Sequence, residues 1–255
     1  MHEPMKIICA YPINLDAVHN VSGDAVNRFI YGIVPEAKEK ITSFRDLISA
    51  LLFCMQTGTG VEILIESKDI AKEIEGSFDW QHRLGGNAGI MADVLAALGA
   101  EPVLNAPALS PRLAEMLNSK VRIPIAGALR SPVQALQDQE MVHFVFQFTK
   151  GQVVKTDLGG TVALKDNRLI ATFDPLNTML YSSPDFDDYC VKNIVDFDGA
   201  LISGFHLVPE TIHKDILKNK LAQIKTWKDI SPRLFIHAEM GSFQNPRIMR
   251  RMMQE

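Results

Sequence analysis

Short apolar strands alternate with amphipathic helices along most of this chain, and this rhythm constrains its fold more than any other feature. The first apolar run spans residues 6–11, and the clearest helix spans residues 44–55 with Ser43 as its cap. Such alternation is typical of a mostly parallel sheet covered by helices. We predict further strands at residues 61–65, 102–104, 121–125, 200–203 and 233–237, and further helices at 68–74, from 110, from 185 to 194, from 209 to 223 and from 245.

The middle of the chain follows a different pattern. Residues 142–148, 152–155, 161–164 and 169–173 form short β runs separated by glycine or polar turns, and no helical pattern fits between them. They predict an antiparallel meander that is inserted into the α/β body as a lid.

The predicted fold is therefore α/β, a partial doubly wound, mostly parallel sheet with an inserted antiparallel β lid. We assign residues 1–12, 40–60, 76–138 and 183–255 to a large, incomplete α/β domain. Residues 13–39, 61–75 and 139–182 are assigned to a small, discontinuous β lid domain.

Composition excludes several classes of protein. The net charge is −4 and no basic tract occurs, which argues against a nucleic-acid partner. The apolar runs are far shorter than the roughly 18 residues that cross a bilayer, so no membrane span is expected. The N-terminus has no signal-peptide layout, and three scattered cysteines are typical of buried thiols in a reducing cytosol. We therefore expect a cytoplasmic protein.

The glycine-rich block at residues 83–92 is the most informative local motif. Gly86 and Asn87 lead directly into a helix whose apolar residues fall at 90, 91, 94, 95 and 98, and Gly99 closes it. Glycines let the backbone approach a ligand closely, and the free N–H groups of a helix start can donate to hydroxyls or anions. The alternative is a glycine turn in front of a core helix.

Polar side chains next to strands are candidate ligand contacts. Asn14 and Asp16 follow the first strand, where open α/β sheets bind ligands, and their amide and carboxylate suit sugar hydroxyls. They could equally form a turn. Glu62 shares a strand face with Glu66, which is more typical of a solvated face.

The middle segment adds three candidates. His143 begins an alternating strand whose other face is aromatic, so it could line a cleft or have a structural role. Asn167 and Arg168 lie just before the last short β run. Arginine grips phosphate well, although a surface turn is the usual place for one.

His237 and Glu239 end a predicted parallel strand. One carboxylate there suits Mg²⁺, with the histidine orienting the carboxylate or a water molecule. The chain contains no Gly-x-Ser-x-Gly elbow, no Walker loop and no Gly-x-Gly-x-x-Gly motif.

Taken together, these motifs resemble the ADP-dependent sugar kinases, the glucokinase and phosphofructokinase group with a ribokinase-like fold. The resemblance covers nearly the whole chain, and the glycine block is its most specific part. The matching pieces occur in order at residues 14–16, 83–89, 143–146, 167–170, 203–205 and 237–239.

The resemblance implies roles for these residues. Residues that would contact the sugar are Asp16, Glu62, Gly86, Asn87 and His143, with Asn14 beside them. Glu62 aligns with a carboxylate that favours glucose as the substrate in this family. Asn167 and Arg168 would lie near the sugar-phosphate end, and Glu239 would help hold Mg²⁺ with His237 in support. The implied reaction transfers the β-phosphate of ADP to a hydroxyl of glucose or fructose 6-phosphate, mainly by positioning and charge neutralisation.

One departure bears directly on activity. The family's catalytic aspartate lies in a Gly-x-Gly-Asp turn, and neither that turn nor the Asn-x-x-Glu metal motif occurs here, so no catalytic residue is assigned. We expect a chain that stops before the catalytic aspartate. The alternatives are a non-catalytic sugar-binding remnant, one subunit completed by a second polypeptide or missing C-terminal half, and an unrelated doubly wound nucleotide-binding regulator.

Overall fold

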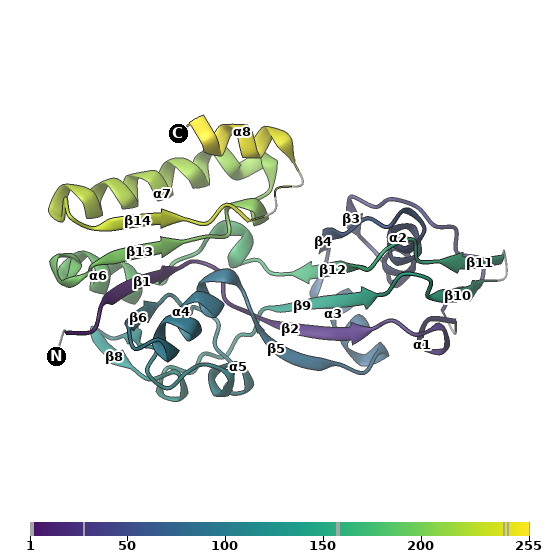
Figure 1. Cartoon of the computed structure of the whole chain (residues 1–255), viewed down its shortest axis with the longest axis horizontal. Coiled ribbons are helices and arrows are strands. Elements are labelled where there is room, and N and C mark those ends of the chain that lie inside the picture. Colours follow the sequence, from purple (N-terminus) through teal and green to yellow (C-terminus); the bar gives the residue numbers. More distant parts are fainter. Residues whose placement is uncertain (1–2, 28, 157–158, 242, 244, 255) are drawn as a thin grey trace. The chain divides into compact units, whose positions relative to one another are not determined.

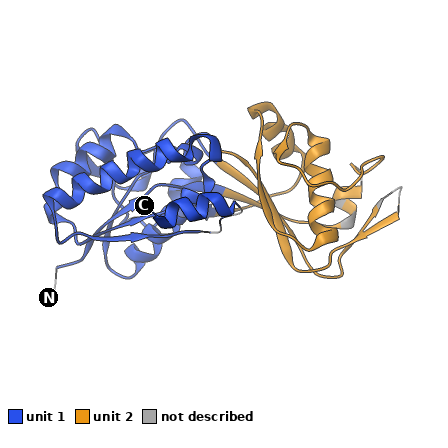
Figure 2. Cartoon of the chain, turned by 90° about the horizontal axis from the view of Figure 1, so that it is seen from above, with its two compact units in different colours: residues 1–15, 84–141, 175–255 blue, residues 16–83, 142–174 orange. Residues whose placement is uncertain are grey.

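The chain forms two compact units, each with its own sheet and apolar core (Figure 2). The computed structural model describes residues 3–27, 29–156, 159–241, 243 and 245–254. Unit 1 comprises residues 1–15, 84–141 and 175–255, and unit 2 comprises residues 16–83 and 142–174.

Unit 1 is built on a parallel sheet of four strands in the order β14-β13-β1-β6 (Figure 1). This non-sequential order requires crossover connections, as expected for a doubly wound sheet. The strands are β1 (Lys6–Ala10), β6 (Glu101–Leu104), β13 (Gly199–Ile202) and β14 (Phe235–Ala238), and a separate hairpin pairs β7 (Ile123–Ile125) with β8 (Ala128–Arg130).

Helices cover this sheet and supply most of the unit's core. Phe186, Leu217 and Trp227 are buried with Ile8 and Ala200 in one cluster. A serine cap and a first-turn proline begin the helix at residue 111 as predicted, and the helix at residue 184 begins in the same way. The helices are α4 (Asn87–Ala97), α5 (Pro111–Met116), α6 (Pro184–Lys192), α7 (Glu210–Ile230) and α8 (Pro246–Gln254), which packs on α7.

Helix α4 packs on the sheet through its small residues and not through its large ones. Its buried residues are Ala88, Gly89, Ala92 and Ala96, which let the helix approach β1 and β6 closely. The predicted core stripe instead faces outward in part: Ile90, Val94 and Leu98 are exposed, and we call these three residues the outer ridge. A helix that is apolar all round is normally buried on every side.

Strand β14 carries a second apolar side chain that is exposed to solvent. Phe235 lies in register with Gly199 of β13, which itself pairs with Ile7 of β1, so the three positions share one sheet face. Phe235 is 65% exposed. Among the described residues, β14 pairs only with β13, so its other edge carries unpaired backbone groups.

Unit 2 is built on a mixed sheet in the order β3-β4-β12-β9-β2-β5 (Figure 1). Strands β3, β4 and β12 run parallel to one another, and β12 runs antiparallel to β9. The strands are β2 (Asn14–Asn20), β3 (Lys40–Ile41), β4 (Val61–Ile65), β5 (Gln81–Gly85), β9 (Val142–Phe148) and β12 (Asn167–Phe173), and the helices are α1 (Gly23–Asn27), α2 (Phe44–Thr57) and α3 (Lys68–Ser77).

The two faces of this sheet differ sharply in character. Phe144 and Phe146 of β9 are buried on one face, where Phe78 and Trp80 contact them at ring-centroid distances of 5.0 to 5.4 Å. Aromatic contacts of this kind contribute about 0.5–1.5 kcal/mol each beyond area burial. The alternation predicted for this strand is therefore confirmed, and His143 lies on the opposite face.

Three features of unit 2 differ from expectation. The predicted meander is wrong in one respect, because β10 (Val153–Thr156) and β11 (Gly159–Val162) form a hairpin sheet of their own while β9 pairs with β12. Strands β2 and β5 were not predicted. Residues 40–60 and 76–83 lie in unit 2, whereas we assigned them to the large domain, because the buried face of α2 packs into the aromatic-rich core.

The described part of the chain contains no helix long and apolar enough to cross a membrane.

All three cysteines are buried and free. Desolvation raises the pKa of the Cys9 thiol to about 12 and that of Cys54 to about 11, so both stay protonated at neutral pH.

Backbone packing explains why glycine stands at position 86. Its φ of +77° is in the left-handed half of the map, and an added Cβ would lie 2.5 Å from the Pro12 carbonyl oxygen and 2.6 Å from the Ile13 Cα. The N–H of Gly89 donates to the same Pro12 carbonyl at 3.3 Å. Both glycines therefore serve the packing of α4 against residues 12 and 13, which is the structural alternative given above.

Replacement of Gly86 by alanine should be more destabilising than the same change at Gly127. Gly127 has nearly the same φ, +76°, but open space around its Cβ direction. Both changes incur the positive-φ cost of roughly 1 kcal/mol, and only Gly86→Ala adds the backbone clash, for a total of about 3 kcal/mol. Urea unfolding of both variants measures the difference, and equal losses would contradict the packing argument.

Candidate functional site

Unit 2 gathers acidic and histidine side chains on the polar face of its sheet. Cross-strand register pairs Thr172 of β12 with His143 of β9 on one side and with Leu64 of β4 on the other, which puts these positions on one face. Alternation along β4 places Glu62 on the same face as Leu64. The Thr172 hydroxyl donates to Glu62 Oε1 at 2.8 Å.

His143 is the centre of this cluster. Its Nε2 lies 2.9 Å from Asp174 Oδ2, and its Nδ1 lies 3.7 Å from Glu62 Oε1. The side chain of Asp174 is fully buried, whereas that of Glu62 keeps one fifth of its surface exposed. The imidazole therefore lies between a buried and an accessible carboxylate.

The charges around His143 decide its protonation. Burial alone lowers its pKa, because a buried imidazolium loses hydration. The hydrogen bond to Asp174 and the charges of Glu62, Asp174 and Asp16 outweigh that effect and raise the pKa of His143 above its ordinary value. When protonated, the imidazole partly neutralises the negative charge of the carboxylates around it.

Asp174 is the residue of this cluster that the sequence analysis missed. It directly follows β12, and the period of two that places Arg168, Ile170 and Thr172 on one face extends to position 174. That alternation was visible in the sequence. The partner of its carboxylate was not, because His143 lies 31 residues away.

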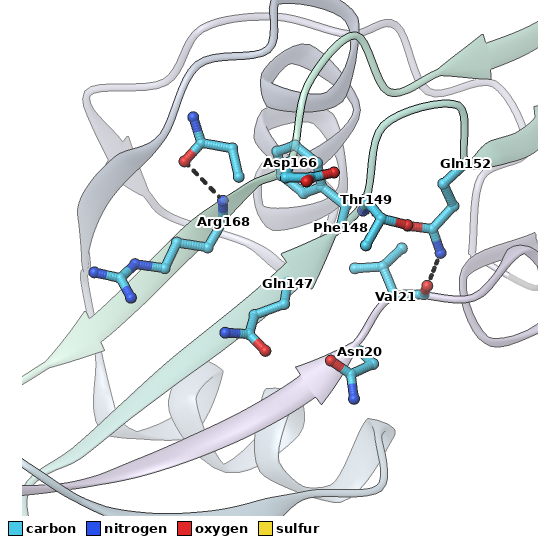
Figure 3. Close-up of a pocket in the computed structure, with 9 residues that line it drawn as sticks. Asn20, Val21, Gln147, Phe148, Thr149, Gln152, Asp166 and Arg168 are labelled. Atoms are coloured by element: carbon cyan, nitrogen blue, oxygen red, sulfur yellow. Dashed lines mark hydrogen bonds between the residues drawn. The ribbon is translucent and has the colours of Figure 1, made fainter.

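A pocket of about 600 Å³ lies at the other end of this sheet face (Figure 3). Arg168 pairs with Gln147 across β12 and β9, four residues along from the pair of Thr172 and His143. At a rise of about 3.3 Å per residue the two places are about 13 Å apart. The pocket is lined by Asn20, Val21, Gln147, Phe148, Thr149, Gln152, Asp166, Asn167 and Arg168.

The predicted pair Asn167 and Arg168 is therefore separated from the His143 cluster. The Asn167 amide donates to the Gly58 carbonyl at 3.0 Å and so ties β12 to the end of α2. Its Oδ1 accepts the backbone N–H of Arg168 at 3.0 Å. Arg168 is exposed at the rim of the pocket.

Unit 1 brings together two other predicted residues. Asn87 is the first residue of α4, and Glu239 follows β14 at its carboxyl end. The Asn87 Nδ2 donates to Glu239 Oε2 at 2.6 Å, and the N–H of Gly241 donates to Oε1 at 2.7 Å. Both carboxylate oxygens are thereby oriented, which the sequence did not predict.

This arrangement bears on the predicted magnesium. The described residues contain no cluster of three or more His, Cys, Asp or Glu side chains that could hold a metal ion. A single oriented carboxylate at a strand end nevertheless fits Mg²⁺, which is commonly held by one or two carboxylates, substrate phosphates and water. His237 is exposed, two residues before Glu239.

Other polar groups lie at the carboxyl ends of the unit 1 strands. The Ser203 hydroxyl after β13 is buried and has no hydrogen-bond partner among the described residues. Among the described residues no side chain caps the start of α4 at Gly86, and of its first-turn amides the Gly89 N–H already donates to the Pro12 carbonyl. Asn14, at the start of β2, is buried.

Comparison with known proteins identifies the family to which this chain belongs. The conserved region of ADP-specific phosphofructokinase/glucokinase matches residues 5–255. The chain is 26% identical to the ADP-specific phosphofructokinase of Methanosarcina acetivorans, over 96% of this chain and 55% of that protein. It is 22% identical to the ADP-dependent glucose/glucosamine kinase of Pyrococcus abyssi, over 88% of this chain and 52% of that protein.

A solved structure agrees with these matches. An ADP-dependent kinase in complex with fructose-6-phosphate and ADPβS superposes with a TM-score of 0.78 at 25% identity, covering 98% of this chain and 53% of that one. The chain thus spans about half the length of the relatives it matches. The alternative of an unrelated nucleotide-binding regulator is wrong: this chain has a ribokinase-like fold and belongs to the ADP-specific phosphofructokinase/glucokinase family.

Proposed function

We propose that this chain forms the sugar-binding part of an ADP-dependent sugar kinase that transfers the β-phosphate of ADP to glucose or fructose 6-phosphate. The observation that carries the proposal is the cluster on the polar face of unit 2. There His143 lies between Glu62 and Asp174, with the charge of Asp16 acting on it. Family membership supports the same reading.

The chemistry of this cluster suits hydroxyl groups. The carboxylates of Asp16 and Glu62 are acceptors for sugar hydroxyls, and the Glu62 side chain, which Thr172 holds through Oε1, keeps one fifth of its surface exposed. Held carboxylates reduce the freedom of a bound sugar, which is the positioning that phosphoryl transfer requires.

Unit 1 supplies groups suited to the phosphate side of the reaction. Glu239 would hold Mg²⁺, with its carboxylate oriented by Asn87 and Gly241. The bound ion would neutralise phosphate charge during transfer. The amides at the start of α4 can donate to an anion. No Gly-x-Gly-Asp turn occurs in these 255 residues, so we expect little or no kinase activity from the chain by itself.

Calorimetric titration with glucose and with fructose 6-phosphate tests the proposal. At least one sugar should bind with a dissociation constant on the order of 1 mM or tighter, a common range for metabolic enzymes. Replacement of Glu62 by glutamine should weaken this binding about tenfold, because a charged acceptor is lost.

The matched control is Glu73→Gln, which removes an exposed carboxylate from α3 in the same unit and should leave the affinity unchanged. Absence of binding to either sugar would contradict the proposal. An equal loss of sugar affinity in both variants would show that Glu62 affects binding only through the net charge of the unit and not through a contact with the sugar.

A second candidate function is favoured by the surface of unit 1. The outer ridge of α4 is exposed at Ile90, Val94 and Leu98, and Phe235 is exposed beside the edge of β14 that no described strand pairs with. Exposed apolar surface next to an open sheet edge is typical of an interaction site. The chain would then be one subunit of a kinase that a second polypeptide completes.

Complementation distinguishes the two candidates. The purified C-terminal part of the Methanosarcina acetivorans enzyme, which this chain does not match, is added to the chain, and AMP formation from ADP and sugar is measured. The second candidate predicts turnover only in the mixture. Phe235→Asp should abolish that turnover, whereas Val195→Asp, at an exposed valine elsewhere in unit 1, should preserve it. An inactive mixture contradicts the second candidate.

A further inference from the structure

The buried carboxylate of Asp174 needs an explanation beyond folding. Its side chain has no exposed surface, and burial of an ionised carboxylate costs several kcal/mol unless it is paired. The His143 Nε2 pairs with this carboxylate at 2.9 Å. Replacement of such a buried pair by apolar side chains of similar volume is often neutral or stabilising, so folding by itself does not require the pair.

The orientation of the imidazole follows from this contact. A hydrogen bond between Nε2–H and Asp174 leaves Nδ1 on the side of Glu62, 3.7 Å from Oε1. The same oxygen accepts the Thr172 hydroxyl. Glu62 thus accepts one hydrogen bond and faces the imidazole at a longer distance, while one fifth of its side-chain surface stays open to a ligand.

We propose that Asp174 is a positioning residue for the sugar site: it fixes the His143 imidazole through Nε2, so that Nδ1–H faces Glu62 and orients that carboxylate for a sugar hydroxyl. This inference rests on the proposed function. His143 then acts chiefly through Glu62, in place of the direct contact to sugar that the resemblance implied.

The proposal makes sugar binding depend on pH in a definite direction. The charged groups that act on His143 are Asp174 after β12, Glu62 on β4 and Asp16 on β2. Protonated His143 donates toward both Asp174 and Glu62. As the pH rises through its pKa, the ring keeps its proton on Nε2 and turns the Nδ1 lone pair toward Glu62. Repulsion then disturbs the carboxylate, and the affinity for glucose falls.

The first test follows the imidazole of His143 by NMR and needs no ligand. Asp174→Asn preserves the shape of the side chain and removes its charge. The pKa of His143 should fall by at least about one unit, because an adjacent opposite charge is lost. The resonances of His19, a buried histidine of the same unit that contacts Phe78, should not change and serve as an internal control.

The wild-type chain gives a second measurement that does not depend on how the variant folds. Above the pKa, nitrogen chemical shifts should show the neutral His143 ring protonated on Nε2. A neutral ring protonated on Nδ1 would overturn the proposal, because Nε2 would then face Asp174 as a lone pair.

The pH profile of glucose binding completes the test. In the wild type the dissociation constant should increase as the pH rises through the pKa of His143, and in Asp174→Asn the midpoint of this increase should move to lower pH. At pH 7 the variant should bind about tenfold more weakly, the loss expected for one charge-assisted hydrogen bond. A folded variant with an unshifted midpoint would overturn the positioning role.

Failure of the two proposals can be told apart. If the wild type binds neither sugar, the proposed function fails, and the NMR titration still decides whether Asp174 controls His143. If the wild type binds glucose and Asp174→Asn behaves identically in binding and titration, the positioning role fails while the proposed function stands.

Discussion

The strict alternation of side chains across the sheet of unit 2 is the constraint on which the candidate site depends. Phe144 and Phe146 are held under Phe78 and Trp80, and this packing sets the face of every other residue on β9. A slip of one residue would bury His143 among the aromatic rings and expose a phenylalanine, at a cost of several kcal/mol. The aromatic core therefore places the polar groups as firmly as it stabilises the unit.

Local patterns in the sequence predicted local structure well. Ser43 caps α2, Ser110 caps α5, and the strand at residues 61–65 forms as expected, because caps and periodicity act within a few residues. The ridge of α4 was misjudged because all its faces are apolar. Only the packed structure shows that the alanines, and not the larger side chains, face the sheet.

Long-range pairing was less accessible to sequence reasoning. Residues 14–20 carry too many polar side chains to read as a strand, and β2 forms because β9 and β5 flank it in the sheet. The contact of Asn87 with Glu239 joins residues 152 positions apart, and that of His143 with Asp174 joins residues 31 apart. The family resemblance indicated most of the polar residues, but not these partnerships.

The buried pair of His143 and Asp174 has a consequence for how the sequence can vary. Loss of the imidazole alone would break a hydrogen-bonded pair with a fully buried carboxylate, which typically costs about 3–5 kcal/mol and is a large share of a domain's stability. Substitution of the histidine alone is therefore disfavoured. Orthologues should carry the histidine and the aspartate as a linked pair, or an uncharged couple of similar volume in their place.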